Sequence, residues 1–232
     1  MPSAPAVRAM FGAIARRYDL LNSILSAGRD RAWRETVVRL IEEQADARPR
    51  RLLDVCCGTG RLAAALWSRF PTARVVGTDF TREMVRIGRA DLLPAIRLQL
   101  ADTLRLPFRA RSFDAATVAF GIRNTQDYRA ALHEMARVLR PGGQLAVLEF
   151  TLPRFPVVRQ AYLLYFTRIL PWVGRLLSGA RTDAYDYLPR SVLSFATDAE
   201  MKTALESAGC SEVRQIPLTL GIVTIHWGRI RG

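Results

Sequence analysis

The chain has 232 residues, of which 50% are hydrophobic, so it can bury a sizeable core as one large domain or two small ones. Its formal net charge of +13 is compatible with nucleic acid, an anionic membrane surface or an acidic ligand as partner. Lys202 is the only lysine, so nearly all of the positive charge is arginine, and the coding composition of the source genome explains the excess equally well.

Helices and strands are predicted to alternate through the first 150 residues. Residues 1–28 form an irregular, partly helical lead-in, and apolar residues at helical spacing predict a helix from Asp30 to about Ala45. Strands are predicted at 51–56, 74–79, 96–100, 113–120 and 145–150, and helices at 62–70, 81–89 and 128–139. Thr81 is the predicted cap of its helix, and Pro141-Gly142-Gly143 closes the last helix. This alternation implies a parallel sheet covered by helices on both faces.

The pattern changes after Phe150. Residues 153–190, with four prolines and many aromatic residues, form an insertion. A helix from Asp198 to Ala208 follows, and then two strands near Val213 and Ile222 that have no helix between them and predict an antiparallel edge. We therefore expect a single α/β domain over residues 1–232, with a helical lead-in (1–48) and a lid over the substrate (151–190).

A glycine-rich loop, D-x-C-x-G-x-G from Asp54 to Gly60, follows the first predicted strand, and Asp79 ends the second. Such a loop brings backbone close to a ligand, and a carboxylate at Asp79 can accept hydrogen bonds from both hydroxyls of a ribose. A phosphate-binding loop would need a lysine and a Ser or Thr at its end, and neither follows Gly60. A nucleoside ligand without phosphates is favoured.

Cys56 and Cys57 are adjacent in this loop. Vicinal cysteines do not easily form an unstrained disulfide, and the chain has no Cys-x-x-Cys pair that would favour zinc. We interpret both as small side chains lining the loop, and we expect no metal and a reducing, cytoplasmic setting. The N-terminal apolar run lacks the cleavage site of a signal peptide, and no apolar run approaches the roughly twenty residues that span a bilayer.

The loop and Asp79 resemble those of the class I S-adenosylmethionine-dependent methyltransferases, which implies a Rossmann-like, mostly parallel sheet of seven strands with an antiparallel last strand. Three longer stretches resemble the ubiquinone/menaquinone biosynthesis C-methyltransferases within that class. They are MFGAIARRYDLLNSILSAGRDRAWR (10–34), residues 119–150 with Phe-Gly-Ile-Arg-Asn, and YDYLPRSVLSF followed by LTLGIVTIHWG. The resemblance covers nearly the whole chain. It departs at Ala119 and Ala196, where many relatives have Ser and Pro.

The resemblance implies S-adenosylmethionine as methyl donor and a ring carbon of a prenylated hydroquinone as acceptor. The favoured acceptor is demethylmenaquinol, and the benzoquinol precursor of ubiquinone is the alternative. The implied cofactor contacts are Asp54, Cys56, Gly58, Thr59, Gly60, Asp79, Phe80, Asp102, Thr103 and Ala119. Thr59 would hold the methionine part, Asp79 the ribose and Asp102-Thr103 the adenine edge. As alternatives, Asp79 and Asp102 cap turns.

Arg123 and Asn124 follow the fourth predicted strand, where substrates of class I enzymes approach the cofactor. A fixed cation favours ionisation of the phenol, which raises electron density on the ring carbon beside it. Arg123 is expected to stabilise the phenolate or to position a water that removes the proton, and Asn124 to orient the ring; the alternative is a structural salt bridge. Tyr18 and Tyr187 are expected in the substrate pocket, and Tyr185 there as an acid/base group, with ordinary packing as the alternative. His226 is a weaker catalytic candidate.

Residues 151–182 contain no acid, and their arginines (154, 159, 168, 175 and 181) are interleaved with aromatic and leucine residues. Such a segment can lie at a membrane interface or cover a greasy substrate. Because a polyprenyl tail is embedded in the bilayer, we interpret the segment as a lid over the substrate and as a peripheral contact with the inner face of the cell membrane. The alternatives are a homodimer contact and an ordinary cap over the site.

Two rival functions stay open. The first is a methyltransferase acting on RNA or another small molecule, although the chain lacks the Asn-Pro-Pro-Tyr and Pro-Cys stretches of nucleobase enzymes, so no nucleic-acid partner is expected. The second is a non-catalytic cofactor-binding or membrane-associated scaffold.

Overall fold

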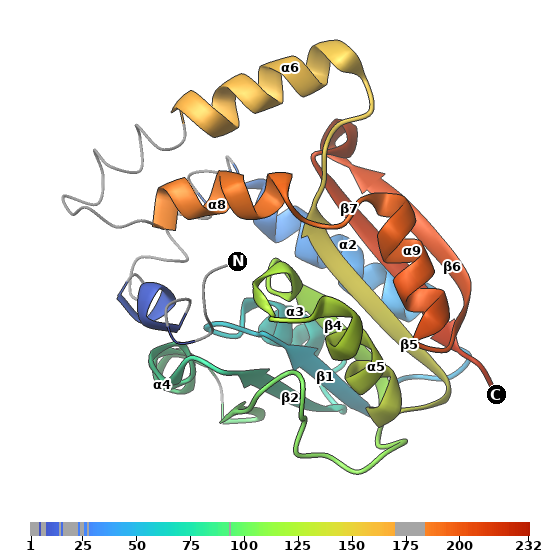
Figure 1. Cartoon of the computed structure of the whole chain (residues 1–232). Helices are drawn as coiled ribbons and strands as arrows, with labels where there is room; N and C mark the ends of the chain where they lie inside the picture. The colour runs from blue at the N-terminus through green and yellow to red at the C-terminus, as the bar shows by residue number, and fades with distance from the viewer. Residues whose placement is uncertain are drawn as a thin grey trace.

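The computed structural model describes residues 5, 8–13, 15, 23, 26, 28–92, 94–169 and 184–232; for Phe166, Ile169, residues 184–186 and Leu188 it describes the backbone alone. A seven-stranded sheet of order β3-β2-β1-β4-β5-β7-β6 forms the centre of this part (Figure 1). The strands are β1 (Arg51–Val55), β2 (Arg74–Asp79), β3 (Ile96–Leu100), β4 (Phe113–Ala119), β5 (Leu139–Phe150), β6 (Cys210–Leu218) and β7 (Val223–Ile230).

The helices agree with the predicted alternation. They are α2 (Arg29–Glu43), α3 (Arg61–Arg69), α4 (Arg82–Asp91), α5 (Tyr128–Val138), α6 (Pro156–Leu164), α8 (Ala184–Leu193) and α9 (Asp198–Ser207), with short turns η1 (Ile122–Asn124), η2 (Tyr165–Ile169) and η3 (Thr219–Gly221). Strands β1 to β5 are parallel, and β7 pairs antiparallel with β5. The predicted sheet with an antiparallel last strand is thus confirmed. The last strand lies inside the sheet, and β6 forms the edge.

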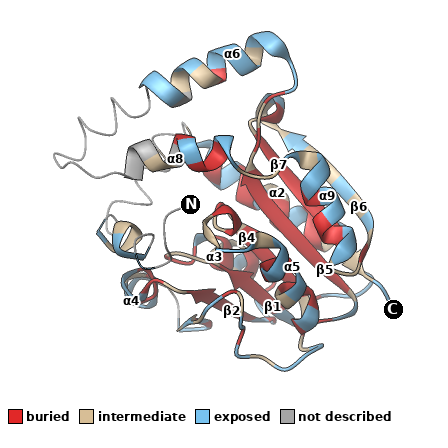
Figure 2. Ribbon diagram, in the orientation of Figure 1, coloured by how far each residue is buried: buried red, intermediate tan, exposed pale blue. Residues whose placement is uncertain are grey.

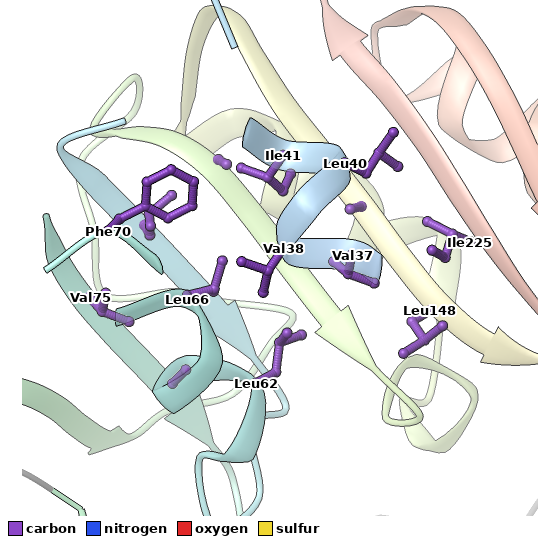
Figure 3. Packing of buried hydrophobic residues seen from close by; sticks show 14 of the residues in the cluster. Val37, Val38, Leu40, Ile41, Leu62, Leu66, Phe70, Val75, Leu148 and Ile225 are labelled. Carbon is purple, nitrogen blue, oxygen red and sulfur yellow. The ribbon is translucent and has the colours of Figure 1, made fainter. Parts of the chain in front are cut away.

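Two apolar clusters hold helices against the two faces of the sheet. On one face, α2 and α3 pack onto the strands through Val37, Ile41 and Leu66, together with Leu148 and Ile225 (Figure 3). On the other face, Leu132 and Met135 of α5 pack with Leu205 of α9. Figure 2 shows the buried sheet between these two layers. Because both faces are covered, the carboxyl ends of the strands are where the fold can expose a site.

Two local predictions were wrong. Strand β5 begins at Leu139 and not at Leu145, so Pro141-Gly142-Gly143 lies within it. Its pairing with β4 shifts register, since Phe113 pairs with Leu139 and Ala115 pairs with Gln144. The extra residues of β5 form an irregularity in the strand. Their proline and glycines are typical of turns, which is why a loop was predicted there. Thr81 occupies the cap position of α4, but its side chain does not cap the helix; its amide donates to Asp79 instead.

The predicted helical insertion is present between β5 and α9. Helix α8 lies between α6 and the sheet (Figure 1). Tyr162 of α6 and Val192 of α8 are buried together and pack against Phe150 and Ile222. The outer side of α6 is exposed (Figure 2), and this exposure is greatest at Val157 (79%) and Phe155 (65%).

Candidate functional site

A cavity opens at the carboxyl ends of β1, β2 and β4, where the strand order reverses between β1 and β4 and where open α/β sheets bind ligands. Its lining includes Asp54, Cys56, Gly58, Thr59, Asp79, Phe80, Asp102, Thr103, Ala119 and Asn124, all predicted from the sequence. It also includes Arg8, Phe11, Arg34, Phe120, Thr125 and Gln126, none of which was a predicted site residue. Segments far apart in the chain thus meet at one edge of the sheet.

Asp79 fixes the glycine loop to the end of β2. The Gly58 amide donates to Asp79 Oδ2 (2.8 Å), and the Thr81 amide donates to Oδ1 (2.8 Å). The turn-capping alternative for Asp79 is therefore present in the structure, although the same carboxylate also lines the cavity. Burial raises the pKa of Asp79, and these amides partly oppose the shift. Each carboxylate oxygen retains a further lone pair for a hydroxyl of a ligand.

Asp54, at the end of β1, is the most buried acid of the cavity, with 1% exposure. The Thr117 hydroxyl donates to Asp54 Oδ1 (3.1 Å), whereas Oδ2 has no hydrogen-bond partner of normal geometry among the described residues. Burial raises the pKa of Asp54 to about 7, and the Arg34 guanidinium opposes this shift. A cationic group of a ligand placed beside Oδ2 would satisfy it.

Cys56 and Cys57 are free thiols in the loop. Cys56 Sγ and Thr103 Oγ1 form a hydrogen bond (3.2 Å), which joins two predicted cofactor residues. Burial raises the pKa of Cys56 to about 12, so this thiol stays protonated and is a poor nucleophile. A Cβ added to Gly121 would lie 2.4 Å from the Cβ of Cys56, so the glycine after Phe120 allows two strand ends to approach.

The other predicted cofactor residues differ in how they meet the cavity. Asp102 lines it, but its Oδ1 also accepts from the Leu104 amide (2.9 Å), as in the turn-capping alternative. Ala119 ends β4 on the cavity and has no side-chain donor. Gly60 does not line the cavity; it precedes α3 with φ +89°, and a Cβ there would lie 2.5 Å from Leu92.

Arg123 does not line the cavity either. It is 4% exposed, and its Nη1 donates to Glu149 Oε1 (2.6 Å) and to the Phe120 carbonyl (2.7 Å). The structure thus gives Arg123 the salt bridge that was the alternative interpretation. Glu149, at 1% exposure, was missed because an isolated acid late in an apolar strand carries no sequence signal. Its burial raises the pKa of its carboxyl, although Arg123 opposes the shift.

Asn124 and Tyr187, two residues predicted separately for the substrate pocket, lie within hydrogen-bonding distance of each other. The Tyr187 hydroxyl donates to Asn124 Oδ1 (2.9 Å), so α8 is tied to the cavity wall. Burial raises the pKa of Tyr187, and the Arg123 guanidinium opposes that shift. Tyr185 lies in α8, but its side chain falls outside the described part, and Tyr18 lies outside the described residues.

The histidines lie away from the cavity lining. His226 of β7 is 1% exposed, and its Nε2 hydrogen-bonds Asp198 Oδ1 (3.1 Å) at the start of α9. His133 of α5 contacts the Ser207 hydroxyl through Nε2 (3.4 Å). Among the described residues, no three His, Cys, Asp or Glu side chains gather closely enough to hold a metal ion. In the same part of the chain no helix is long and apolar enough to cross a membrane.

The cavity fits a ligand that has a nucleoside at one end and an amino acid at the other. Asp79 offers acceptors for a ribose, and Asp102 with Thr103 offers polar groups for a base. Asp54 Oδ2 offers an acceptor for an ammonium group, and no described residue donates a hydrogen bond of normal geometry to it. S-adenosylmethionine has these parts, so the residues present fit the cofactor that the sequence resemblance implies.

Comparisons with known proteins agree with this geometry. Residues 3–230 match the model of the ubiE/COQ5 methyltransferase family. The chain is 47% identical to a demethylmenaquinone methyltransferase of Thermus thermophilus, over 94% of this chain and 99% of the relative. It is 43% identical to a ubiquinone/menaquinone biosynthesis C-methyltransferase UbiE of Geobacter sp. strain M21, over 96% and 95%. A demethylmenaquinone methyltransferase of Deinococcus radiodurans is 44% identical, over 96% and 92%.

Solved structures agree on the fold. A SAM-dependent methyltransferase from Thermotoga maritima superposes with a TM-score of 0.66 at 17% identity, covering 96% of this chain and 99% of that chain. The CurJ carbon methyltransferase superposes with a TM-score of 0.64 at 17% identity, covering 90% and 55%. At these identities the likeness shows the class I methyltransferase fold.

Proposed function

The chain belongs to the ubiE/COQ5 methyltransferase family, as an S-adenosylmethionine-dependent C-methyltransferase of ubiquinone/menaquinone biosynthesis, and we propose that its acceptor is demethylmenaquinol. The observation that carries this choice is the 47% identity, over nearly the whole chain, to a relative named demethylmenaquinone methyltransferase. The benzoquinol precursor of ubiquinone is the second candidate, because the Geobacter relative is named for both pathways.

In this proposal the cofactor lies along the strand ends. Asp79 accepts from the ribose hydroxyls while the Gly58 amide holds the carboxylate in place. Asp54 faces the amino group of the methionine part, with Thr59 beside it in the loop. Asp102 and Thr103 border the adenine, and Ala119 and Phe80 complete the walls. When bound, S-adenosylmethionine supplies a methyl group on a sulfonium sulfur.

In this proposal the acceptor ring lies beside Asn124, a residue of the cavity lining that α8 contacts through Tyr187. Asn124 is held by Tyr187, so its amide is oriented before the substrate arrives. The methyl transfer needs a ring carbon in line with the donor at near-attack distance, and this pair would fix the ring for that approach. Tyr18 and Tyr185 stay predictions for the same pocket.

Arg123 adjoins the cavity wall, because its Nη1 donates to the carbonyl of Phe120, which lines the cavity. The same nitrogen pairs with Glu149, while Nη2 donates to no described residue. The guanidinium is close enough to the Tyr187–Asn124 pair to lower the pKa of Tyr187, although Glu149 acts in the opposite direction. We assign to Arg123 the stabilisation of the phenolate, directly or through a water, because a buried cation strongly favours the charged form of a nearby phenol.

The insertion is proposed to meet the membrane that holds the polyprenyl tail, at its inner, cytoplasmic face. Phe155, which precedes α6, is 65% exposed, and Val157 and Leu164 within the helix are 79% and 60% exposed. Arg154, Arg159 and Arg168 are exposed on the same segment. An apolar helix face flanked by arginines binds anionic lipid at the interface without spanning the bilayer. A homodimer that buries this face is the alternative use of the same surface.

The test is methyl transfer from labelled S-adenosylmethionine to chemically reduced demethylmenaquinol in detergent, with the reduced demethylated ubiquinone precursor in parallel. Label in the naphthoquinol supports the proposal. The parallel reaction shows whether the enzyme also methylates the benzoquinol. Label in the benzoquinol alone would reverse the assignment. No label in either, in protein that binds the cofactor by calorimetry, would refute the quinol proposal and direct the search to other acceptors, RNA among them.

A further inference from the structure

Arg34 of α2 is an arginine of the cavity wall that the proposed function has not used. It is 8% exposed, and its Nη1 donates to both Asp30 Oδ2 (2.6 Å) and the Asp30 carbonyl (3.0 Å). Nη2 and Nε donate to no residue in the described ranges. One nitrogen therefore anchors the guanidinium, and no described residue occupies the two others.

The helix that carries Arg34 is rigid. Its neighbours Trp33, Val37 and Val38 pack into the cluster between α2, α3 and the sheet. Asp30, one turn earlier, is 3% exposed and holds the arginine head from the same helix. Because helix and anchor are both buried, the guanidinium has little freedom, and a planar fork held this way is suited to a carboxylate.

Arg34 lies at the end of the cavity where the methionine part is expected. Its Cζ is 5.6 Å from the ring centroid of Phe120, the residue after Ala119. Its charge also reaches the carboxylate of Asp54, which it helps to keep ionised. An amino acid carries an ammonium and a carboxylate on one carbon, so a buried acid and a buried arginine side by side match both groups.

The other arginines of the lining are placed differently. Arg8 stacks on Phe80 (5.4 Å from Cζ to the ring centroid), next to Asp79 at the ribose end. The Arg61 side chain is 42% exposed, and its Nη1 donates to Ser23 (3.2 Å). Ala119 lines the cavity without a side-chain donor, so position 119 supplies no hydrogen bond to a carboxylate.

We propose that Arg34 binds the carboxylate of the cofactor's methionine part through Nη2 and Nε, with Asp30 as the residue that positions it. The inference rests on the cofactor of this family and not on the choice of quinol. It is tested by binding alone, so its failure and a failure of the quinol proposal are distinguishable.

The experiment is calorimetric titration with S-adenosylhomocysteine and with the same molecule lacking its carboxylate, S-adenosyl-3-thiopropylamine. The wild-type protein should bind the second ligand roughly ten- to hundredfold more weakly, the factor expected for a charge-assisted pair. Arg34→Ala should weaken the binding of S-adenosylhomocysteine by a similar factor. The affinity for the ligand without a carboxylate should stay within about twofold of the wild-type value. Arg31→Ala, a substitution on the exposed side of α2, should change neither affinity.

If Arg34→Ala does not fold because Asp30 loses its partner, Arg34→Lys is the variant that tests the proposal. It keeps the positive charge but lacks the planar guanidinium that can bind a carboxylate through two nitrogens. It should weaken S-adenosylhomocysteine severalfold and the amine ligand not at all. Equal weakening of both ligands in a folded variant would show that Arg34 only supports the shape of the cavity and would overturn the proposal. Equal affinity of the wild-type protein for the two ligands would overturn it as well.

Discussion

The cavity wall and the insertion are built on different principles. The wall is made of short loops at strand ends, where buried carboxylates such as Asp54 and Asp79 are held by backbone amides and a threonine. The insertion places two helices over this edge, with a small buried cluster around Tyr162 and Val192 and an exposed apolar face on α6. The cavity wall is held in place by the strands of the sheet, whereas the insertion packs against the sheet through a small cluster.

The difference teaches where the binding energy of each substrate is expected to come from. A soluble cofactor is recognised by hydrogen bonds in a site formed before it arrives, so single polar substitutions in the wall should be costly. A prenylated acceptor is recognised largely by apolar surface, whose loss is distributed over several side chains.

Asp79→Ala should weaken binding of S-adenosylhomocysteine by about 3 kcal/mol or more, a hundredfold or greater loss, because the ribose acceptor and the anchor of the Gly58 amide are removed together. Calorimetric titration measures the change. Asp91→Ala, an exposed acid at the end of α4, is the matched control and should stay within about twofold. Wild-type affinity in the Asp79 variant would refute the assignment of this carboxylate.

Arg123→Met should lower the free energy of unfolding by about 3–5 kcal/mol, because Glu149 is left as a buried charge without its partner. Urea denaturation measures this loss. The double variant Arg123→Met/Glu149→Met should recover most of the stability, since a buried ion pair replaced by apolar groups is often nearly neutral. Its turnover on the quinol should stay lost while cofactor binding is normal; recovered turnover would reduce Arg123 to a purely structural residue.

Asp54→Asn should change how stability depends on pH in the ligand-free protein. The folded-state pKa of Asp54, about 7, lies above the ordinary value of 3.8, so its contribution to stability is complete below about pH 4 and is lost as the pH rises to about 7. The asparagine variant should match the wild type near pH 4 and exceed it above pH 7 by roughly 2–4 kcal/mol. Urea denaturation across this range checks the window, and parallel stability curves would contradict it.

Phe155→Ser/Val157→Ser should weaken binding to vesicles of phosphatidylglycerol and phosphatidylcholine by roughly 1–2 kcal/mol, since two exposed apolar side chains of α6 are removed. The free energy of unfolding should change by about 0.5 kcal/mol or less. Vesicle sedimentation at two salt concentrations measures the binding. Leu100→Ser, at an exposed leucine of β3, is the control. Unchanged sedimentation, with a shift from dimer to monomer in the α6 variant, would favour the homodimer alternative.

Much of this fold and cavity wall could be predicted from the sequence, because the order of helices and strands follows from local patterns. The carboxyl ends of parallel strands meet at one edge of a sheet, so the loop after the first strand and the acid that ends the second were enough to bring Asp54 and Asp79 together. The resemblance to the family added Thr103, Ala119 and Asn124, which line the same cavity. The sequence motifs also identified the family, and the match to the family model confirms it.

Which charged groups pair with one another could not be predicted from the sequence, because it depends on packing between distant segments. Arg123 and Glu149 are separated by 26 residues and pair because β4 and β5 are neighbours. Arg34 reaches the cavity because α2 packs across the sheet, and β7 enters the sheet inside β6 because it pairs with β5. The hydrophobic periodicity of a segment indicates whether that segment forms a helix or a strand. It does not indicate which buried group of another segment will lie opposite.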